Sequence, residues 1–162
     1  MRIGVVSDTH GFLDPRLPAA LEGVEAILHA GDVGARAALD ALAAIAPLYA
    51  VRGNNDDRLG GLGLPLRLDV TLAGVRFHLV HQLPHAEPGD AQVVVYGHTH
   101  RPLAERREGR LYVNPGAAGR VGFHRTLSLA LLETRDGAVA VEPVELGPRL
   151  AVARTPARRK AG

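Results

Sequence analysis

The sequence predicts an α/β (α+β) protein in which two mixed β-sheets pack together and helices cover their outer faces. Two observations lead to this prediction. The first third of the chain alternates apolar, strand-like runs with helical runs, which is typical of parallel strands joined by crossover helices. The remainder contains pairs of strand-like runs separated by short turns, which is typical of hairpins. No linker separates the two parts, so we expect a single domain over residues 1–150.

The first third is predicted to fold in the order β-α-β-α-β. Residues 2–6 (RIGVV) and 26–29 (AILH) read as buried strands, with a short helix over residues 16–22 between them. Residues 35–45 are rich in Ala and Leu, and three apolar side chains are spaced to share one helical face (Leu39, Leu42 and Ile45). Pro47 ends this helix, and residues 48–51 supply a third strand.

The remaining strands are predicted mainly as hairpins around small or polar turns. Residues 66–73 and 75–81 flank Ala73-Gly74, and residues 103–107 and 110–114 flank Glu108-Gly109. Residues 127–133 and 138–144 flank Asp136-Gly137, a favoured hairpin turn. Residues 92–96 form one further strand. His78 lies in the middle of the first hairpin and is expected to face outward.

Composition excludes several classes of protein. The chain has 162 residues and no cysteine, which excludes disulfides and thiolate metal sites. No apolar run is long enough to span a bilayer, and Met1-Arg2 leads directly into a strand rather than a signal sequence, so we expect a cytoplasmic protein without membrane partners. The basic residues 151–162 are expected to form a flexible tail, or else an electrostatic handle for a polyanion.

Chemically reactive side chains follow five of the predicted strands at the point where each strand ends. The candidates are Asp8, His10, Asp32, Asn54, His81, His98 and His100. Sites in open α/β sheets form outside the carboxyl ends of strands, so these residues are expected to converge. Residues two apart on an extended segment point to one side, so Asp8 can join His10 and His98 can join His100 at one centre.

The residue types in this set are those of a site for borderline divalent metals. Carboxylate and imidazole ligands together suit Mn, Fe, Co, Ni or Zn, whereas a calcium site would use oxygen ligands throughout. Seven candidate ligands are too many for one tetrahedral ion. They fit two ions about 3.5–4 Å apart with one bridging carboxylate. A filled site of this kind would be positively charged and would attract a phosphoryl group.

The ordered motifs resemble those of the calcineurin-like metallophosphoesterases. The matching runs are D-x-H (Asp8, His10), G-D (Gly31, Asp32), G-N-x-D (Gly53, Asn54, Asp56), His81 and G-H-T-H (Gly97 to His100). Asn114-Pro115-Gly116 is similar to the N-P-G-S segment of that family. The similarity covers residues 2 to about 145, and the short chain resembles the YfcE-type phosphodiesterases in particular.

The resemblance implies a four-layer αββα sandwich and a hydrolase acting on small phosphodiesters or other phosphate esters. It implies one metal held by Asp8, His10, Asp32 and His100, and a second held by Asp32, Asn54, His81 and His98, with Asp32 bridging. Manganese is the expected metal, and Ni, Fe, Co or Zn are alternatives. We assign catalysis to Asp8, Asp32, Asn54 and His98.

Three positions depart from the family pattern. Asn55 stands where many relatives carry a histidine that is taken to protonate the leaving group, and an amide cannot do this. The enzyme would then use another acid or prefer good leaving groups. Gln82 follows His81 where the family usually has Gly, and Ala117 replaces the Ser of N-P-G-S.

Five residues are expected to support the ligands or to line the rim of the site: Asn55, Asp56, His29, Asn114 and His124. Asp56 is expected to orient a ligand or cap its loop rather than bind metal. His29 is equally compatible with a core histidine whose hydrogen bonds are satisfied.

Three other functions stay open at this point: a scaffold that keeps the fold and binds a protein partner, a phosphomonoesterase, and a nuclease that uses the basic tail. The oligomeric state is also open.

Overall fold

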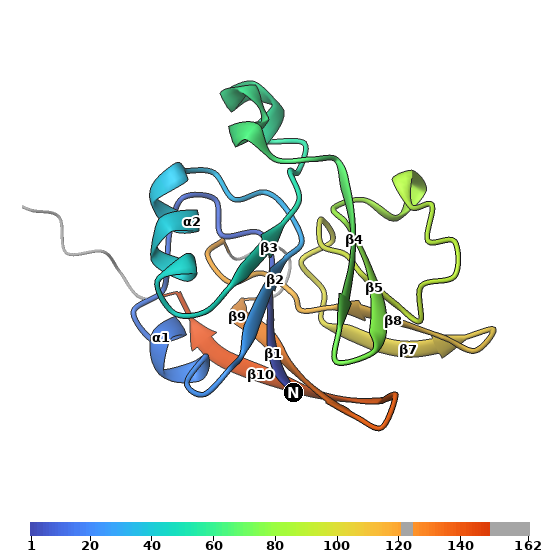
Figure 1. Cartoon of the computed structure of the whole chain (residues 1–162). Coiled ribbons are helices and arrows are strands. Elements are labelled where there is room, and N and C mark those ends of the chain that lie inside the picture. Colours follow the sequence, from blue (N-terminus) through green and yellow to red (C-terminus); the bar gives the residue numbers. More distant parts are fainter. Residues whose placement is uncertain (121–124, 150–162) are drawn as a thin grey trace, which may run out of the picture.

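Two five-stranded β-sheets form the molecule (Figure 1). The computed structural model describes residues 1–120 and 125–149. His124 and the tail 151–162, for which we predicted a rim position and flexibility, lie outside the described residues. Among the described residues, no helix is long and apolar enough to cross a membrane.

The first sheet has the strand order β10-β9-β1-β2-β3. Three parallel strands, β1 (Arg2–Val6), β2 (Ala26–His29) and β3 (Leu48–Ala50), form one side of it. The hairpin of β9 (Thr126–Arg135) and β10 (Ala138–Pro148) adds two antiparallel strands beside β1. The parallel part is therefore the β-α-β-α-β unit that the sequence predicts.

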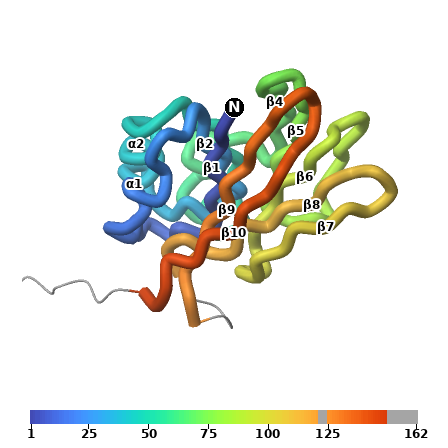
Figure 2. Tube along the Cα trace, turned by 90° about the horizontal axis from the view of Figure 1, so that it is seen from below, coloured from blue at the N-terminus to red at the C-terminus, as the bar shows by residue number. Residues whose placement is uncertain are grey.

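The second sheet has the order β4-β5-β6-β8-β7. Two antiparallel hairpins, β4 (Arg67–Leu72) with β5 (Val75–Val80) and β7 (Leu103–Arg107) with β8 (Arg110–Asn114), flank the central β6 (Val93–Val95). β6 runs parallel to both β5 and β8. In the view from below, the strands of the second sheet lie to the right of β9 and β10 of the first sheet (Figure 2).

The main core fills the space between the sheets. Its members come from the inward faces of both, for example Ile3 and Leu28 from the first sheet and Phe77 and Val95 from the second. The helices α1 (Leu17–Ala20) and α2 (Arg36–Ala43) lie on the outer face of the first sheet (Figure 1). Leu39 and Leu42 of α2 are buried there, as the helical spacing predicts.

The outer face of the second sheet is covered differently. Instead of an α-helix, the described residues place there the segment that follows β5, with its short 3₁₀ helix η2 (Leu83–His85). Leu83 and Ala86 of this segment pack on Val80, Val94 and Tyr96. The fourth layer of the sandwich is thus reduced to one covering loop. A second 3₁₀ segment, η1 (Asp56–Gly63), follows β3 at the top of Figure 1.

Candidate metal centre

The predicted ligands follow strands that point the same way in each sheet, so they collect at one edge of the sandwich. Backbone hydrogen bonds then hold the loops against one another: the amide of Asp8 donates to Gly31 O (3.0 Å) and that of His10 to Asp32 O (2.9 Å). The amide of His98 donates to Asp8 Oδ2 (3.1 Å), which connects the second sheet to the first. The convergence expected of strand ends is present.

Two groups of these side chains are close enough to hold a metal ion. Asp8, His10 and His100 form one group, in which His100 Nε2 lies 3.0 Å and His10 Nε2 3.8 Å from Asp8 Oδ1. Asp8, Asp32 and His81 form the other, in which His81 Nε2 lies 3.5 Å from Asp32 Oδ2 and 3.9 Å from Asp8 Oδ1.

The carboxylates of Asp8 and Asp32 lie between the histidines of the two groups. Asp8 is common to the two groups, whereas the resemblance implies Asp32 as the bridge. Asp32 Oδ2 nevertheless lies 3.7 Å from His10 Nε2 and 3.5 Å from His81 Nε2, so it reaches toward both sides. Asp8 is fully buried and Asp32 is 2% exposed, so two negative charges stand together with little water to stabilise them.

Several ligand atoms in the centre are buried and lack hydrogen-bond partners. Among the described residues, these include Asp8 Oδ1, His10 Nε2 and His81 Nε2. Buried polar atoms are normally paired, because leaving one unpaired costs about 1–3 kcal/mol. Three such atoms directed at one small space, with two carboxylates beside them, fit divalent cations.

A backbone hydrogen bond sets the tautomer of His81 that can bind a metal ion through Nε2. His81 Nδ1 lies 2.7 Å from Ala30 O, a carbonyl that can only accept, so Nδ1 carries the proton and Nε2 presents its lone pair to the centre. Burial alone would lower the pKa of His81, but the carboxylates of Asp32 and Asp8 outweigh it and raise the pKa above its ordinary value. The neighbouring Gln82 leaves this geometry in place.

Burial and neighbouring groups also shift the pKa values of Asp32 and His10. Burial would raise the pKa of Asp32, but the electrostatic effect of the neighbouring His81 and the hydrogen bonds from Asn55 outweigh it and hold the pKa well below its usual range. Burial lowers the pKa of His10, although the carboxylates of Asp32 and Asp8 oppose this effect. Both shifts favour the forms that bind metal, an ionised carboxylate and a neutral imidazole.

Left-handed backbone concentrates at the candidate ligands. Nine described non-glycine residues have a positive φ, and five of them are Asp8, His10, Asp32, His98 and His100, with φ from 48° to 68°. Such residues cost roughly 1–3 kcal/mol each and persist where the surroundings determine them, often at functional sites. Asp8 and His10 therefore converge through tight left-handed turns, and our premise of an extended segment was wrong.

The glycines of the motifs leave room for ligands from other loops. A Cβ on Gly97 would overlap Ser7 Oγ and lie 2.8 Å from Asp8 Oδ2, and one on Gly53 would overlap Asp32 Oδ1. Any larger residue at either position would displace a carboxylate of the centre.

Asp56 fixes the loops and takes no part in either metal-binding group. Fully buried, it accepts three backbone N–H groups: Val33 (3.0 Å) and Gly53 (2.9 Å) at Oδ2, and Gly34 (2.8 Å) at Oδ1. It ties the loop after β2 to the loop after β3.

Asn55 contacts Asp32 directly. Its backbone N–H donates to Asp32 Oδ1 (2.8 Å) and its amide Nδ2 to Asp32 Oδ2. It therefore orients this carboxylate.

His29 and Asn114 support the centre through hydrogen bonds. His29 Nδ1 accepts from Gly31 N (3.2 Å), so Nε2 donates to Thr9 Oγ1 (3.0 Å), which donates in turn to Val33 O (2.9 Å). Burial lowers the pKa of His29 to about 4, so the ring is neutral. Asn114 Nδ2 donates to Gly97 O (2.9 Å) and to Thr99 Oγ1 (3.0 Å) in the G-H-T-H loop.

Two predicted ligands lie at the rim, outside both groups. Asn54 is exposed and follows β3 at the same edge of the sandwich. His98 is also exposed, and its ring makes an edge contact with His81 at a centroid distance of 5.3 Å. The amide of Gln82 lies 3.2 Å from His98 Nε2.

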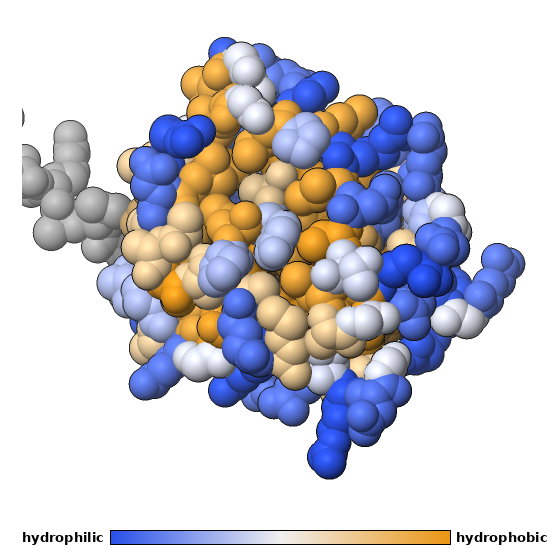
Figure 3. Space-filling view, viewed as in Figure 1, coloured by the Kyte–Doolittle hydropathy of each residue, from blue (hydrophilic) through white to orange (hydrophobic). Residues whose placement is uncertain are grey.

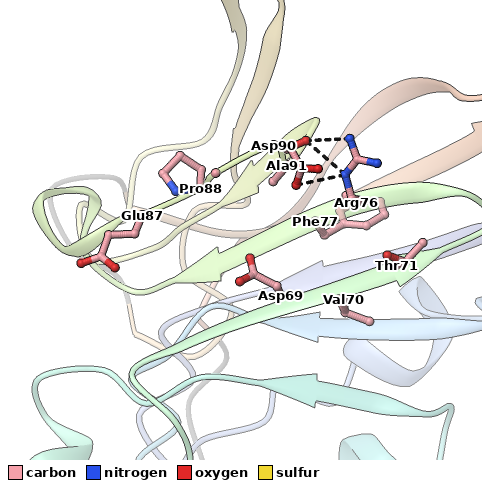
Figure 4. Close-up of a pocket in the computed structure, with 10 residues that line it drawn as sticks. Asp69, Val70, Thr71, Arg76, Phe77, Glu87, Pro88, Asp90 and Ala91 are labelled. Carbon is pink, nitrogen blue, oxygen red and sulfur yellow. Dashed lines mark hydrogen bonds and ion pairs between the residues drawn. The ribbon is translucent and has the colours of Figure 1, made fainter.

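His78 faces outward from its sheet, as predicted, but it is buried there rather than exposed to solvent. The covering loop encloses the side chain: Glu87 N donates to Nε2 (3.3 Å) and Nδ1 donates to Asp69 Oδ1 (2.7 Å). A cavity nearby lies between the β4–β5 hairpin and residues 87–91, and there Arg76 pairs with Asp90 (Figure 4). No pattern in the sequence reveals this covering loop.

Comparisons with known proteins add independent information. Residues 1–137 match the model of the calcineurin-like phosphoesterase superfamily domain. A probable metallophosphoesterase of Methanothermobacter thermautotrophicus is 33% identical over 134 residues, which cover 72% of this chain and 77% of the relative. A probable metallophosphoesterase of Bacillus subtilis is 30% identical over 154 residues, 87% of this chain and 89% of the relative.

Solved structures share the fold. Vps29 from Entamoeba histolytica, studied as a single mutant, gives a TM-score of 0.71 at 21% identity over 91% of this chain and 100% of that one. The phosphoesterase YfcE from E. coli gives 0.64 at 25% identity over 89% of this chain and 98% of that one.

Proposed function

The chain belongs to the calcineurin-like phosphoesterase superfamily, and from this premise we propose that it is a phosphodiesterase working with two divalent metal ions. The observation that carries the proposal is the set of buried ligand atoms without partners, Asp8 Oδ1, His10 Nε2 and His81 Nε2. A relative from Methanocaldococcus jannaschii that is named a phosphodiesterase, 29% identical over 139 residues, favours diesters as the substrate class. Manganese is the proposed metal, with Ni, Fe, Co and Zn as alternatives.

In this proposal each ion has four protein ligands. The first would be held by Asp8, His10, Asp32 and His100. The second would be held by Asp32, Asn54, His81 and His98. The carboxylates of Asp8 and Asp32 supply two negative charges, and the Ala30 carbonyl keeps Nε2 of His81 free to bind. The exposed Asn54 and His98 complete the second set at the rim, where a substrate arrives.

Two metal ions held by these residues would acidify a water for attack on phosphorus and would stabilise the charge that develops on the phosphoryl oxygens. Asn55 donates a hydrogen bond from its side-chain amide to Asp32 Oδ2. An amide is too weak an acid to protonate a leaving group. We therefore propose that the enzyme acts best on esters whose leaving groups are weak bases that need no protonation, such as p-nitrophenolate, and acts poorly on phenyl and alkyl esters.

Hydrolysis of bis-p-nitrophenyl phosphate and p-nitrophenyl phosphate, after chelation and then re-addition of Mn²⁺ or Ni²⁺, tests the function. We expect metal to restore activity, with the diester preferred. His81→Ala should lose this activity and part of the bound metal. His85→Ala changes an exposed histidine four residues later and should alter neither.

Metal content is measured in parallel with activity, so that the possible outcomes can be separated. A preference for the monoester would make the protein a phosphomonoesterase. Cleavage of DNA that fails when residues 151–162 are deleted, while turnover of the small diester persists, would support the nuclease. Two bound ions without turnover of any ester would refute the enzymatic proposal.

A scaffold is the second candidate, and one observation favours it. An apolar groove lies between the edge strands β3 and β4, lined in part by Leu48, Tyr49, Leu64, Pro65 and Leu68. Apolar side chains gather across the middle of the face seen in Figure 3, whereas hydrophilic ones lie around its margins. Apolar surfaces of this kind often mark protein interfaces. Turnover on any ester, together with no binding partner at this face, would reject the scaffold.

A further inference from the structure

A groove begins beside the G-H-T-H loop and is separate from the metal-binding groups. It has a volume of about 420 Å³, and its lining residues are Tyr96, Thr99, Arg101, Pro102, Leu103, Glu105 and Arg107. Thr99 lies between the candidate ligands His98 and His100, so one end of the groove adjoins the centre. Asn114 donates a hydrogen bond to Thr99 Oγ1 (3.0 Å), which fixes this wall.

The charges of the groove are uneven. Arg107 pairs with Glu105 and lies 5.5 Å from the centroid of the Tyr112 ring, so its charge is compensated at the far end. Arg101 directly follows His100, is exposed, and forms no ion pair with any residue in the described ranges 1–120 and 125–149. The groove therefore has one guanidinium without an ion pair among the described residues, on the residue that directly follows the candidate ligand His100.

The wall between these two ends is apolar. Tyr96 is buried, and Pro102 and Leu103 are exposed beside it. Leu103 is 38% exposed and is one of two large apolar side chains that are exposed in the described part of the chain; the other is Leu59. A concave site with apolar walls and one placed charge is typical of small-ligand sites, and the volume accommodates an aromatic ring.

We propose that this groove binds one ester substituent of the substrate, an aromatic group of the aryl or nucleobase class, while Arg101 binds a phosphate oxygen. Guanidinium is well suited to phosphate because it offers several fixed donors. The inference rests on the proposed phosphodiesterase function and narrows its substrates to diesters with an aromatic substituent.

Binding of two poorly hydrolysed diesters tests the inference without relying on turnover. Diphenyl phosphate and dimethyl phosphate carry the same charge and differ in their aromatic rings. Calorimetry with the Mn²⁺-loaded protein should give at least about tenfold tighter binding of diphenyl phosphate, as expected for burying a ring.

Three variants separate the contributions. Leu103→Ser should reduce the preference for diphenyl phosphate about three- to tenfold. Leu59→Ser removes the other exposed leucine and should leave the preference unchanged. Arg101→Gln should weaken both diesters by a similar factor. Both leucines are exposed, so we expect the variants to fold, which circular dichroism checks.

The outcomes distinguish this inference from the proposed function. If the protein hydrolyses diesters but Leu103→Ser keeps the full preference, or Leu59→Ser loses it, the groove assignment is overturned and the function stands. If neither diester binds and no ester is turned over, both are overturned. If diphenyl phosphate binds tightly through Leu103 but no ester is hydrolysed, the groove stands as a binding site and the catalytic proposal fails.

Discussion

Removing the Asp56 carboxylate should destabilise the protein far more than a typical surface change. Asp56→Ala leaves three backbone N–H groups, of Val33, Gly34 and Gly53, without their acceptor. Each lost bond to a charged acceptor is worth about 1.5–3 kcal/mol, and water can reach the half-buried Gly34, so we expect a loss of roughly 3–6 kcal/mol. This is a large part of the stability of an ordinary domain, about 5–15 kcal/mol.

Urea unfolding of the metal-free protein measures this loss, and the neighbouring Asp57→Ala provides a matched control. Asp57 is exposed and pairs with Arg52 at 2.9 Å, an interaction worth about 0–1 kcal/mol. Asp56→Asn, which keeps one acceptor oxygen, should fall between the two. A loss below about 1 kcal/mol for Asp56→Ala, or equal losses for Asp56→Ala and Asp57→Ala, would refute the role of Asp56 in holding the loops.

Three further predictions concern pH, packing and the leaving group. Because the pKa of His29 is about 4 in the folded protein and near 6.5 when unfolded, the unfolded state gains a proton first on acidification. The His29 contribution to the free energy of unfolding should therefore fall by up to about 3 kcal/mol between pH 6.5 and 4. His29→Gln should lose less stability than the unchanged protein by this amount over the same range, and parallel pH profiles of the two proteins would contradict this. Gly97→Ala should lower the metal affinity at least tenfold, because the added Cβ would displace Asp8 Oδ2. Calorimetry measures this affinity, and an unchanged value would mean that the loop moves to accommodate the Cβ without disturbing Asp8. Asn55→His should raise the rate on alkyl esters relative to p-nitrophenyl esters, since it supplies an acid; an unchanged dependence of rate on leaving-group pKa would show that protonation comes from elsewhere.

The order and bounds of the strands could be predicted from the sequence, because apolar runs and turn residues are local signals. The ten predicted strands are present among the described residues, with the longest difference at β10, which continues to Pro148. The convergence of Asp8, Asp32 and His98 followed from the same pattern, since parallel strands end at one edge.

Other features depend on contacts that no local pattern encodes. The left-handed φ of Asp8 and His10 is imposed by the loops that meet there. His78 is buried because a distant segment folds over it, and the periodicity of β5 records only which face it occupies. The contact of Asn55 with Asp32 requires the register between two loops, which the motif spacing leaves undetermined.

The hydrogen bond from His98 N to Asp8 Oδ2 joins residues 90 positions apart and connects the two sheets. Contacts of such long range form late in folding, because closing a long loop costs chain entropy before the contact is made. We therefore expect the metal centre to be assembled only after both sheets have formed, so that an ion would have no complete site to bind on the partly folded chain. Metal should slow the unfolding rate of this protein and leave its refolding rate nearly unchanged, so the ion would act on the lifetime of the native state.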